Sequence, residues 1–199
     1  MLTVKSEIAI ELSKLRDFEN PRISLEQYMT PPELAADIIH SAFMNGDIED
    51  HRILDAGAGT GILGIGAALA GAGEVVAVEK DEAAVKILKE NLDNSRTSGK
   101  VKVRHEDIEE VDEQFDTVLM NPPFSTHSET GTVFIEKALE LADNVYAVGH
   151  PGLEDEFRRL ADEHRIKASE GYTISLPATY GFHTEESRET PVRVVVATR

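Results

Sequence analysis

The 199-residue chain contains no cysteine, which excludes disulfide bonds and metal sites built on thiolates. Its longest apolar runs, of about ten residues, are too short to cross a bilayer. Residues 1–10 carry charges and lack the long apolar core of a signal peptide. We therefore expect a cytoplasmic protein with no membrane segment, and no residue pattern here predicts a metal site.

Basic residues are scarce: 20 Lys and Arg stand against 37 Asp and Glu, a net charge of −17. Such a surface remains hydrated where high salt screens repulsion between like charges. One hypothesis is a salt-tolerant host such as a halophilic archaeon, and the alternative is a merely acidic protein from an ordinary one. The charge opposes nucleic-acid binding unless high salt, a local basic patch or a basic partner offsets the repulsion.

Apolar periodicity alternates between strand-like and helix-like segments along the whole chain. Predicted strands cover residues 52–55, 74–79, 101–104, 115–120, 144–149, 171–176 and 191–197. Predicted helices cover residues 7–18, 31–44, 61–71, 81–94, 131–142 and 152–164, and Thr30 is the expected N-cap of the second. This order predicts one α/β domain, residues 1–199, with an N-terminal helical extension at 1–30. We expect a Rossmann-like, seven-stranded, mostly parallel sheet with an antiparallel terminal strand and helices on both faces.

The first core strand runs directly into a glycine-rich turn. Gly57, Gly59 and Gly61 allow the backbone to approach a ligand where a Cβ would clash. The helix that follows presents its N-terminus to the polar end of that ligand. The turn lacks the lysine of a phosphate-binding loop and the G-x-G-x-x-G spacing of dinucleotide enzymes, so NAD is the second choice of cofactor.

Three acidic residues follow the ends of successive strands. Asp55 is placed to accept a hydrogen bond from an ammonium group, and Glu79, about 20 residues after the turn, from ribose hydroxyls. Asp107 can accept from an adenine amino group, with Ile62 and Ile108 against the rings. Alone, each acid is typical of a solvated loop, but the series predicts a site for an adenosyl cofactor.

The predicted strand 115–120 ends in the corner Asn121-Pro122-Pro123-Phe124. The Asn121 side-chain carbonyl and the Pro122 backbone carbonyl can accept the two N–H bonds of a planar amine. The prolines stiffen the corner, and Phe124 offers a face on which a base can stack. Although such a corner can be an ordinary turn, beside the glycine turn it predicts methylation of an exocyclic nitrogen by S-adenosylmethionine.

The chain resembles the archaeal and eukaryotic methyltransferase-like-five family, class I methyltransferases that make N6-methyladenine in small-subunit ribosomal RNA. The resemblance rests on residues 25–30 (LEQYMT) before a proline, on the 55–61 turn, on the 121–124 corner and on residues 176–183 (LPATYGFH). It covers nearly the whole chain, and the LEQYMT segment is the discriminating motif because the 121–124 corner occurs in several amino-methyltransferase families.

The resemblance implies a role for each matching position. Implied cofactor contacts are Gln27, Thr30, Gly57, Thr60, Ile62, Glu79 (where the family usually has aspartate), Asp107 and Ile108. The implied catalytic corner is Asn121, Pro122, Pro123 and Phe124. Phe124, Tyr180, Phe182 and His183 are the implied substrate side, although the last three fit equally well as core aromatics beside a turn.

The chain departs from some relatives after His183, where it reads TEESRE at 184–189 in place of a lysine run. The resemblance also implies a small zinc-binding activator subunit that pairs with a sheet edge, which we expect at Val101 to Arg104 because an unpaired edge needs covering. RNA could instead contact basic residues on two predicted helical faces: Lys14, Arg16 and Arg22, or Arg158, Arg159, Arg165 and Lys167.

Three other functions use related parts. Methylation of a protein glutamine amide uses the same corner, typically with tyrosine in place of Phe124. DNA adenine methylation needs a target-recognition domain, for which 199 residues leave no room. A non-catalytic role in ribosome assembly would not require Asn121 and Pro122.

Overall fold

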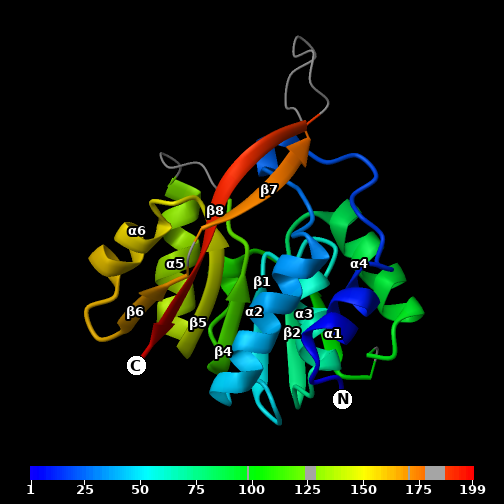
Figure 1. The fold of residues 1–199 in the computed structure, drawn as a ribbon, viewed down its shortest axis with the longest axis horizontal. Helices are drawn as coiled ribbons and strands as arrows, with labels where there is room; N and C mark the ends of the chain where they lie inside the picture. Colours follow the sequence, from blue (N-terminus) through cyan, green and yellow to red (C-terminus); the bar gives the residue numbers. More distant parts are fainter. Residues whose placement is uncertain (98, 124–128, 170, 178–186) are drawn as a thin grey trace.

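The computed structural model describes residues 1–97, 99–123, 129–169, 171–177 and 187–199. These ranges form one layered α/β structure, with a central sheet between two groups of helices (Figure 1). The helices are α1 (Lys5–Leu12), α2 (Pro32–Asn45), α3 (Ile62–Leu69), α4 (Glu82–Asn94), α5 (Glu129–Leu141) and α6 (Leu153–Leu160), with 3-10 turns η1 (Ile23–Leu25) and η2 (Ile108–Glu110). No helix in the described ranges is long and apolar enough to cross a membrane.

The strands run in the order β3-β2-β1-β4-β5-β8-β6, with β7 paired to β8. Their bounds are β1 (Arg52–Ala56), β2 (Glu74–Glu79), β3 (Val101–His105), β4 (Phe115–Met120), β5 (Ala142–Gly149), β6 (Arg165–Ala168), β7 (Tyr172–Pro177) and β8 (Ser187–Thr198). The first five are parallel to one another, and β8 runs antiparallel to β5, β6 and β7. The predicted parallel sheet with an antiparallel end is confirmed.

The described sheet has eight strands rather than the predicted seven, because β6 was not anticipated. The predicted helix 152–164 stops at Leu160, and the chain re-enters the sheet at Arg165. Arg165 and Lys167 are exposed and alternate with half-buried residues, so this short edge strand has little of the apolar signal that marks a strand in a sequence.

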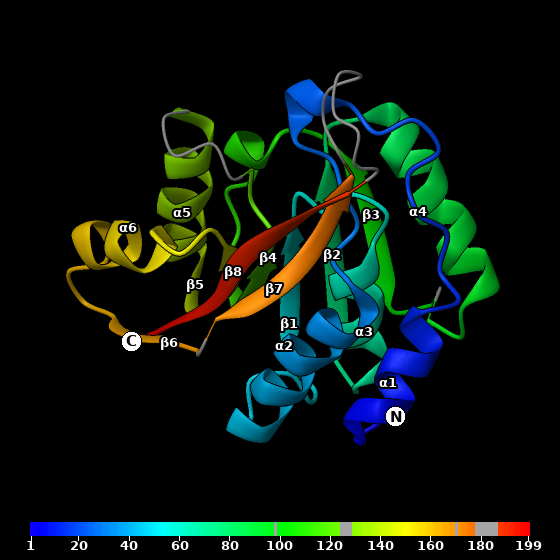
Figure 2. The ribbon, with the colours of Figure 1, turned by 45° about the horizontal axis from the view of Figure 1, so that its top comes forward.

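Alternate residues of each inner strand feed two separate cores. In β2, Val75 and Ala77 pack with α1, α2, α3 and α4, whereas Val76 and Val78 pack with α5 and α6. Such double-sided burial explains the continuous apolar runs, which are typical of parallel strands covered on both faces. The β7–β8 ribbon leaves this layer and arches across the end of the sheet where β1, β2 and β4 finish (Figure 2).

The chain before α2 is tied to the core. Helix α1 ends at Leu12, earlier than the predicted 18, and the segment after it crosses to the glycine turn. There the buried Asn91 side chain accepts from the Arg16 N–H (2.8 Å) and donates to the carbonyls of Arg16 (3.0 Å) and Thr60 (2.9 Å). Asn91 therefore fixes the N-terminal segment beside the turn.

Candidate active site

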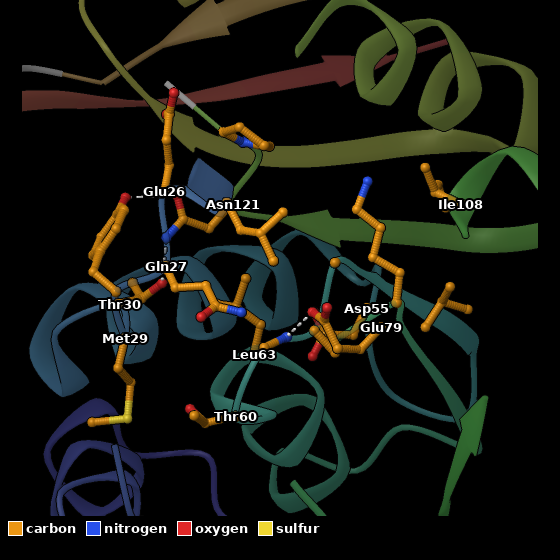
Figure 3. A pocket seen from close by; sticks show the side chains of 18 of the residues that line it. Glu26, Gln27, Met29, Thr30, Asp55, Thr60, Leu63, Glu79, Ile108 and Asn121 are labelled. Atoms are coloured by element: carbon orange, nitrogen blue, oxygen red, sulfur yellow. Dashed lines mark hydrogen bonds between the residues drawn. The ribbon is translucent and has the colours of Figure 1, made fainter. Parts of the chain in front are cut away.

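A cavity of about 210 Å³ lies where β1, β2 and β4 end, which is where open α/β sheets bind ligands. All ten predicted cofactor contacts line it: Gln27, Thr30, Asp55, Gly57, Gly59, Thr60, Ile62, Glu79, Asp107 and Ile108. Asn121 and Pro123 line the same cavity (Figure 3). The structure thus brings the two sequence motifs to one place.

The glycine turn is shaped by its backbone and by two aromatic rings. Gly57 and Gly59 have φ values of +66° and +55°, which residues with a side chain rarely adopt. A Cβ on Gly57 would come within 2.9 Å of the Phe134 ring, and one on Gly59 within 3.0 Å of the Phe18 ring. Only glycine therefore allows both rings to approach the turn so closely.

Asp55 is buried at the end of β1, and its Oδ2 accepts a hydrogen bond from the Gly64 N–H at 2.7 Å. Burial and then the nearby charge of Glu79 raise the pKa of Asp55 to about 7, while the Gly64 bond opposes the rise. A positive group in the cavity would lower the pKa of Asp55 again, because it stabilises the charged carboxylate.

Both carboxylate oxygens of Glu79 accept hydrogen bonds from backbone N–H groups, and one of these groups belongs to the glycine turn. Oε2 accepts from the Gly59 N–H and Oε1 from the Asp81 N–H, each at 2.8 Å. A carboxylate oxygen can accept more than one hydrogen bond, so these contacts leave capacity for ribose hydroxyls. The carboxylate therefore shapes the glycine turn as well as lining the cavity.

Asp107 begins the η2 turn, and its Oδ1 accepts from the Glu109 N–H at 3.3 Å. Its other oxygen lies 3.3 Å from the Lys80 ammonium. Ile62 and Ile108 are almost fully buried and line the same cavity, so their apolar surface can contact planar rings there.

The segment before α2, residues 25–30, is called the connector here, and its residues line the cavity. The Gln27 side chain donates to Asp81 Oδ2 at 2.6 Å and accepts from the Arg22 N–H at 2.8 Å. Its neighbour Glu26 adopts a φ of +51°, an uncommon conformation for a residue with a side chain. The connector is therefore hydrogen-bonded to Asp81, two residues after Glu79 in the chain.

The corner after β4 is the acceptor side of the site. Asn121 is half-buried and lines the cavity with Pro123, whereas Pro122 is buried and is not among the lining residues. The predicted substrate residues Phe124, Tyr180, Phe182 and His183 lie outside the described ranges.

The cavity fits an adenosyl cofactor. Thr60 is buried, lines the cavity, and its Oγ1 has no hydrogen-bond partner among the described residues, so a polar ligand group would satisfy it. Asp55 at one wall suits a cation, and the turn at Gly57 and Gly59 leaves room that side chains would fill.

Several residues of the site were not predicted from the sequence. Phe18, Tyr28 and Phe134 line the cavity, and Asn91 supports it from α4. Phe134 belongs to a helix with ordinary apolar periodicity, and nothing local distinguishes Asn91 from a solvated asparagine. Tyr28 is the exception, because it stands inside the LEQYMT motif.

The fold and the cavity define a class I methyltransferase that uses S-adenosylmethionine. The methyltransferase small domain model matches residues 34–149. The chain is 33% identical to the rRNA N(6)-adenosine-methyltransferase METTL5 of Danio rerio, covering 88% of this chain and 89% of that protein. It is 34% identical to Mettl5 of Drosophila melanogaster, covering 88% and 87%. The chain therefore belongs to the METTL5 family.

A solved structure from Pyrococcus horikoshii, described as a candidate RNA methyltransferase, agrees with this assignment. It is 38% identical to the chain, covers 100% of this chain and 99% of its own, and superposes with a TM-score of 0.87. Magnesium protoporphyrin IX methyltransferase from Synechocystis, solved with bound S-adenosylmethionine, shares only the fold, at 19% identity and a TM-score of 0.64.

Proposed function

We propose that this protein transfers a methyl group from S-adenosylmethionine to the N6 amino group of an adenosine in RNA, with small-subunit ribosomal RNA as the substrate. The observation that carries the proposal is the presence of Asn121 in the wall of the cofactor cavity, which Asp55 and Glu79 also line. Relatives of the same length named as rRNA N(6)-adenosine methyltransferases support the choice of substrate.

On the acceptor side, the Asn121 and Pro122 carbonyls accept the two N–H bonds of the adenine amine, and Phe124 stacks on the base. These contacts orient a weak nucleophile and favour the positive charge that develops on it. No side chain needs to act as a base, because the nitrogen becomes acidic once it is alkylated and loses its proton afterwards.

The cofactor supplies an electrophilic methyl group. Asp55 would hold its ammonium group, Glu79 its ribose hydroxyls and Asp107 its adenine amino group. Gln27, Thr30 and Thr60 would bind its polar end from the connector and the turn, and Ile62 and Ile108 its rings. All of these residues line one cavity.

The proposal is tested by incubating the protein with ribosomal RNA and labelled S-adenosylmethionine, then digesting the RNA and mapping the labelled nucleoside. We expect the label in N6-methyladenosine at one position. Label that appears in protein glutamine, with the RNA unlabelled, would instead establish the glutamine methyltransferase activity that shares this corner.

We also propose that a small zinc-binding activator pairs with β3. This strand is the outermost on its side of the sheet, so one of its edges has no partner strand among the described residues. In this strand Lys102 and His105 are exposed, and Val103 and Arg104 are half-buried. Pairing would continue the sheet and cover that edge.

Hydrogen exchange with and without the activator tests the pairing. We expect new protection of amides in β3, while β6 at the opposite edge serves as the internal control and remains unchanged. Protection at β6, or a lone protein as active as the mixture, would contradict the proposal.

A partner would also explain how so acidic a protein holds RNA. The basic side chains before α2 that were considered for RNA contact are already paired with carboxylates: Lys14 with Glu11 (2.6 Å), Arg16 with Glu19 (2.5 Å) and with Glu90, and Arg22 with Asp81 (3.3 Å). These pairs lower the local positive potential available to phosphate.

A further inference from the structure

The amide of Asn121 is held at both ends by residues of the connector. The Tyr28 hydroxyl donates to Asn121 Oδ1 at 2.7 Å. Asn121 Nδ2 donates to Thr30 Oγ1 at 3.0 Å (Figure 3). Thr30 was expected to cap α2, but the capping position is Pro31 and no side chain caps that helix. The Thr30 hydroxyl serves the active site instead.

Both connector groups are shielded from water. Thr30 is 2% exposed, and burial is the main cause that raises the pKa of the Tyr28 phenol well above its ordinary value of 10. The phenol therefore keeps its proton at every working pH, and Tyr28 remains a hydrogen-bond donor to Asn121 throughout.

The orientation of this amide decides whether the site can work. The oxygen and nitrogen ends of an asparagine amide have nearly the same shape, so packing alone does not choose between them. If the amide flipped, its NH2 group would face the N–H bonds of the substrate amine, and two donors would oppose each other. Asn121 must therefore present its oxygen to the amine.

The two hydroxyls differ in donor strength, and this difference favours the orientation in which the amide oxygen faces the substrate amine. A phenol is more acidic than an aliphatic alcohol and is the stronger hydrogen-bond donor, so Tyr28 selects the oxygen end of the amide and leaves the NH2 end for Thr30. The amide oxygen accepts two hydrogen bonds. One comes from Tyr28, and the other position remains for the substrate.

We propose that Tyr28 is a positioning residue, which fixes the Asn121 amide with its oxygen directed toward the substrate amine. This inference rests on the proposed function for its kinetic consequence, although the orientation of the amide can be measured without any substrate. The competing explanation is packing alone, since the Tyr28 ring also lies against the hydrophobic core.

The Tyr28→Phe substitution separates the two explanations, because it keeps the ring and removes the hydroxyl. We expect kcat to fall at least tenfold, while KM for RNA and Kd for S-adenosylmethionine stay within about twofold. A ring that acts only by packing would leave kcat unchanged, and that result would overturn the proposal.

Tyr146→Phe is the matched control. Tyr146 is fully buried, its hydroxyl donates to Asp47 Oδ2 at 2.6 Å and accepts from Asn45 at 2.7 Å, and it lies away from the cavity. We expect this variant to lose stability without losing kcat. A comparable fall in kcat for both variants would indicate a general effect of removing buried hydroxyls, and would count against a specific role for Tyr28.

A second measurement does not depend on activity. The side-chain NH2 resonances of Asn121, assigned through their absence in Asn121→Ala, should form one sharp pair in the wild type and broaden or double in Tyr28→Phe. Unchanged resonances would refute the positioning role. Changed resonances in a protein that methylates no RNA would keep the positioning role and refute the proposed substrate.

Discussion

Carboxylates gather at both ends of the parallel strands, but their surroundings differ. Where β1 and β2 end, Asp55 and Glu79 accept hydrogen bonds from backbone N–H groups and line a cavity. Where β1 and β2 begin, Glu74 and Glu113 pair with cations: Arg52 contacts both, Lys102 pairs with Glu74 and Arg104 with Glu113.

The pKa values of the two groups move in opposite directions. Burial raises the pKa of Asp55 to about 7, whereas hydrogen bonds from Lys102 and Arg52 lower the pKa of Glu74 and Glu113 respectively. At the first end, Asp55 is buried without a cationic partner among the described residues and suits a positive ligand, whereas Asp107 nearby is paired with Lys80. At the other end, Glu74 and Glu113 are already paired with cations. A buried acid without a cation is therefore a stronger sign of a ligand site than an acid that only follows a strand.

The largest expected effect is at the site end. Asn121→Ala removes the acceptor for the substrate amine, so we expect activity to fall by about 100-fold or more while cofactor affinity stays within a few-fold. Single-turnover transfer and calorimetric binding measure the two quantities. Asn144→Ala, at the beginning of β5, is the control, and activity surviving in Asn121→Ala would contradict the catalytic assignment.

Two glycines have similar backbone angles but different amounts of space around them, so their substitutions separate backbone strain from crowding at the site. Gly61 (φ +91°) stands at the site, and an added Cβ would overlap the Leu88 side chain; Gly46 (φ +86°), after α2, has no atom within 4 Å of that position. We expect Gly46→Ala to cost about 1 kcal/mol from backbone strain alone and Gly61→Ala about 3 kcal/mol. Urea unfolding measures both, and equal losses would show that space at Gly61 is not limiting.

The raised pKa of Asp55 makes cofactor binding depend on pH. Because a bound ammonium favours the charged carboxylate, affinity should rise up to about tenfold per pH unit until pH 7 and then level off. Without cofactor, stability should fall as pH rises from about 4 to 7, since only the native state keeps the proton there. Asp55→Asn retains any titration of the cofactor and serves as the control; identical profiles would refute the role of Asp55.

Salt should act on the whole molecule because its net charge is −17. We expect molar KCl to stabilise the protein by about 2 kcal/mol, roughly 4–8 °C in unfolding midpoint for a chain of this size, as repulsion is screened. Thermal unfolding at low and molar KCl measures the shift. No rise would end the hypothesis of a salt-tolerant host.

The smallest effect is at the paired end. Glu113→Gln removes contacts with Arg52 and Arg104 that are partly exposed, so we expect a loss of about 0.5 kcal/mol, absent at high salt. This contribution is present above the ordinary carboxylate pKa of 4.5 and disappears as pH falls through the lowered pKa. A loss of stability comparable to that of Gly61→Ala would contradict the small contribution expected from these partly exposed ion pairs.

The motifs that a sequence displays locally were the ones that could be predicted. Doubly buried strands and the glycine turn have recognisable patterns, and the ten predicted cofactor contacts line one cavity, although Gln27, Thr30 and Thr60 were implied only by the family resemblance. The strand β6 could not be predicted, since its polar–apolar alternation, with Arg165 and Lys167 exposed, extends over only 4 residues. The prediction that Thr30 caps α2 was wrong. A threonine before a helix is typical of a cap, and nothing local in the sequence indicates its hydrogen bond with Asn121.

By itself, the sequence determined the class of chemistry, because a glycine turn and an Asn-Pro-Pro-Phe corner that each follow a strand of a parallel sheet lie at the same edge of that sheet. Only the tertiary structure decided how that corner is held. Tyr28 and Asn121 are far apart in the chain, and a hydroxyl and an amide come within 2.7 Å only after α2 and β4 have packed. Long-range hydrogen bonds of this kind depend on the folded geometry and leave no periodic trace in the residues that form them.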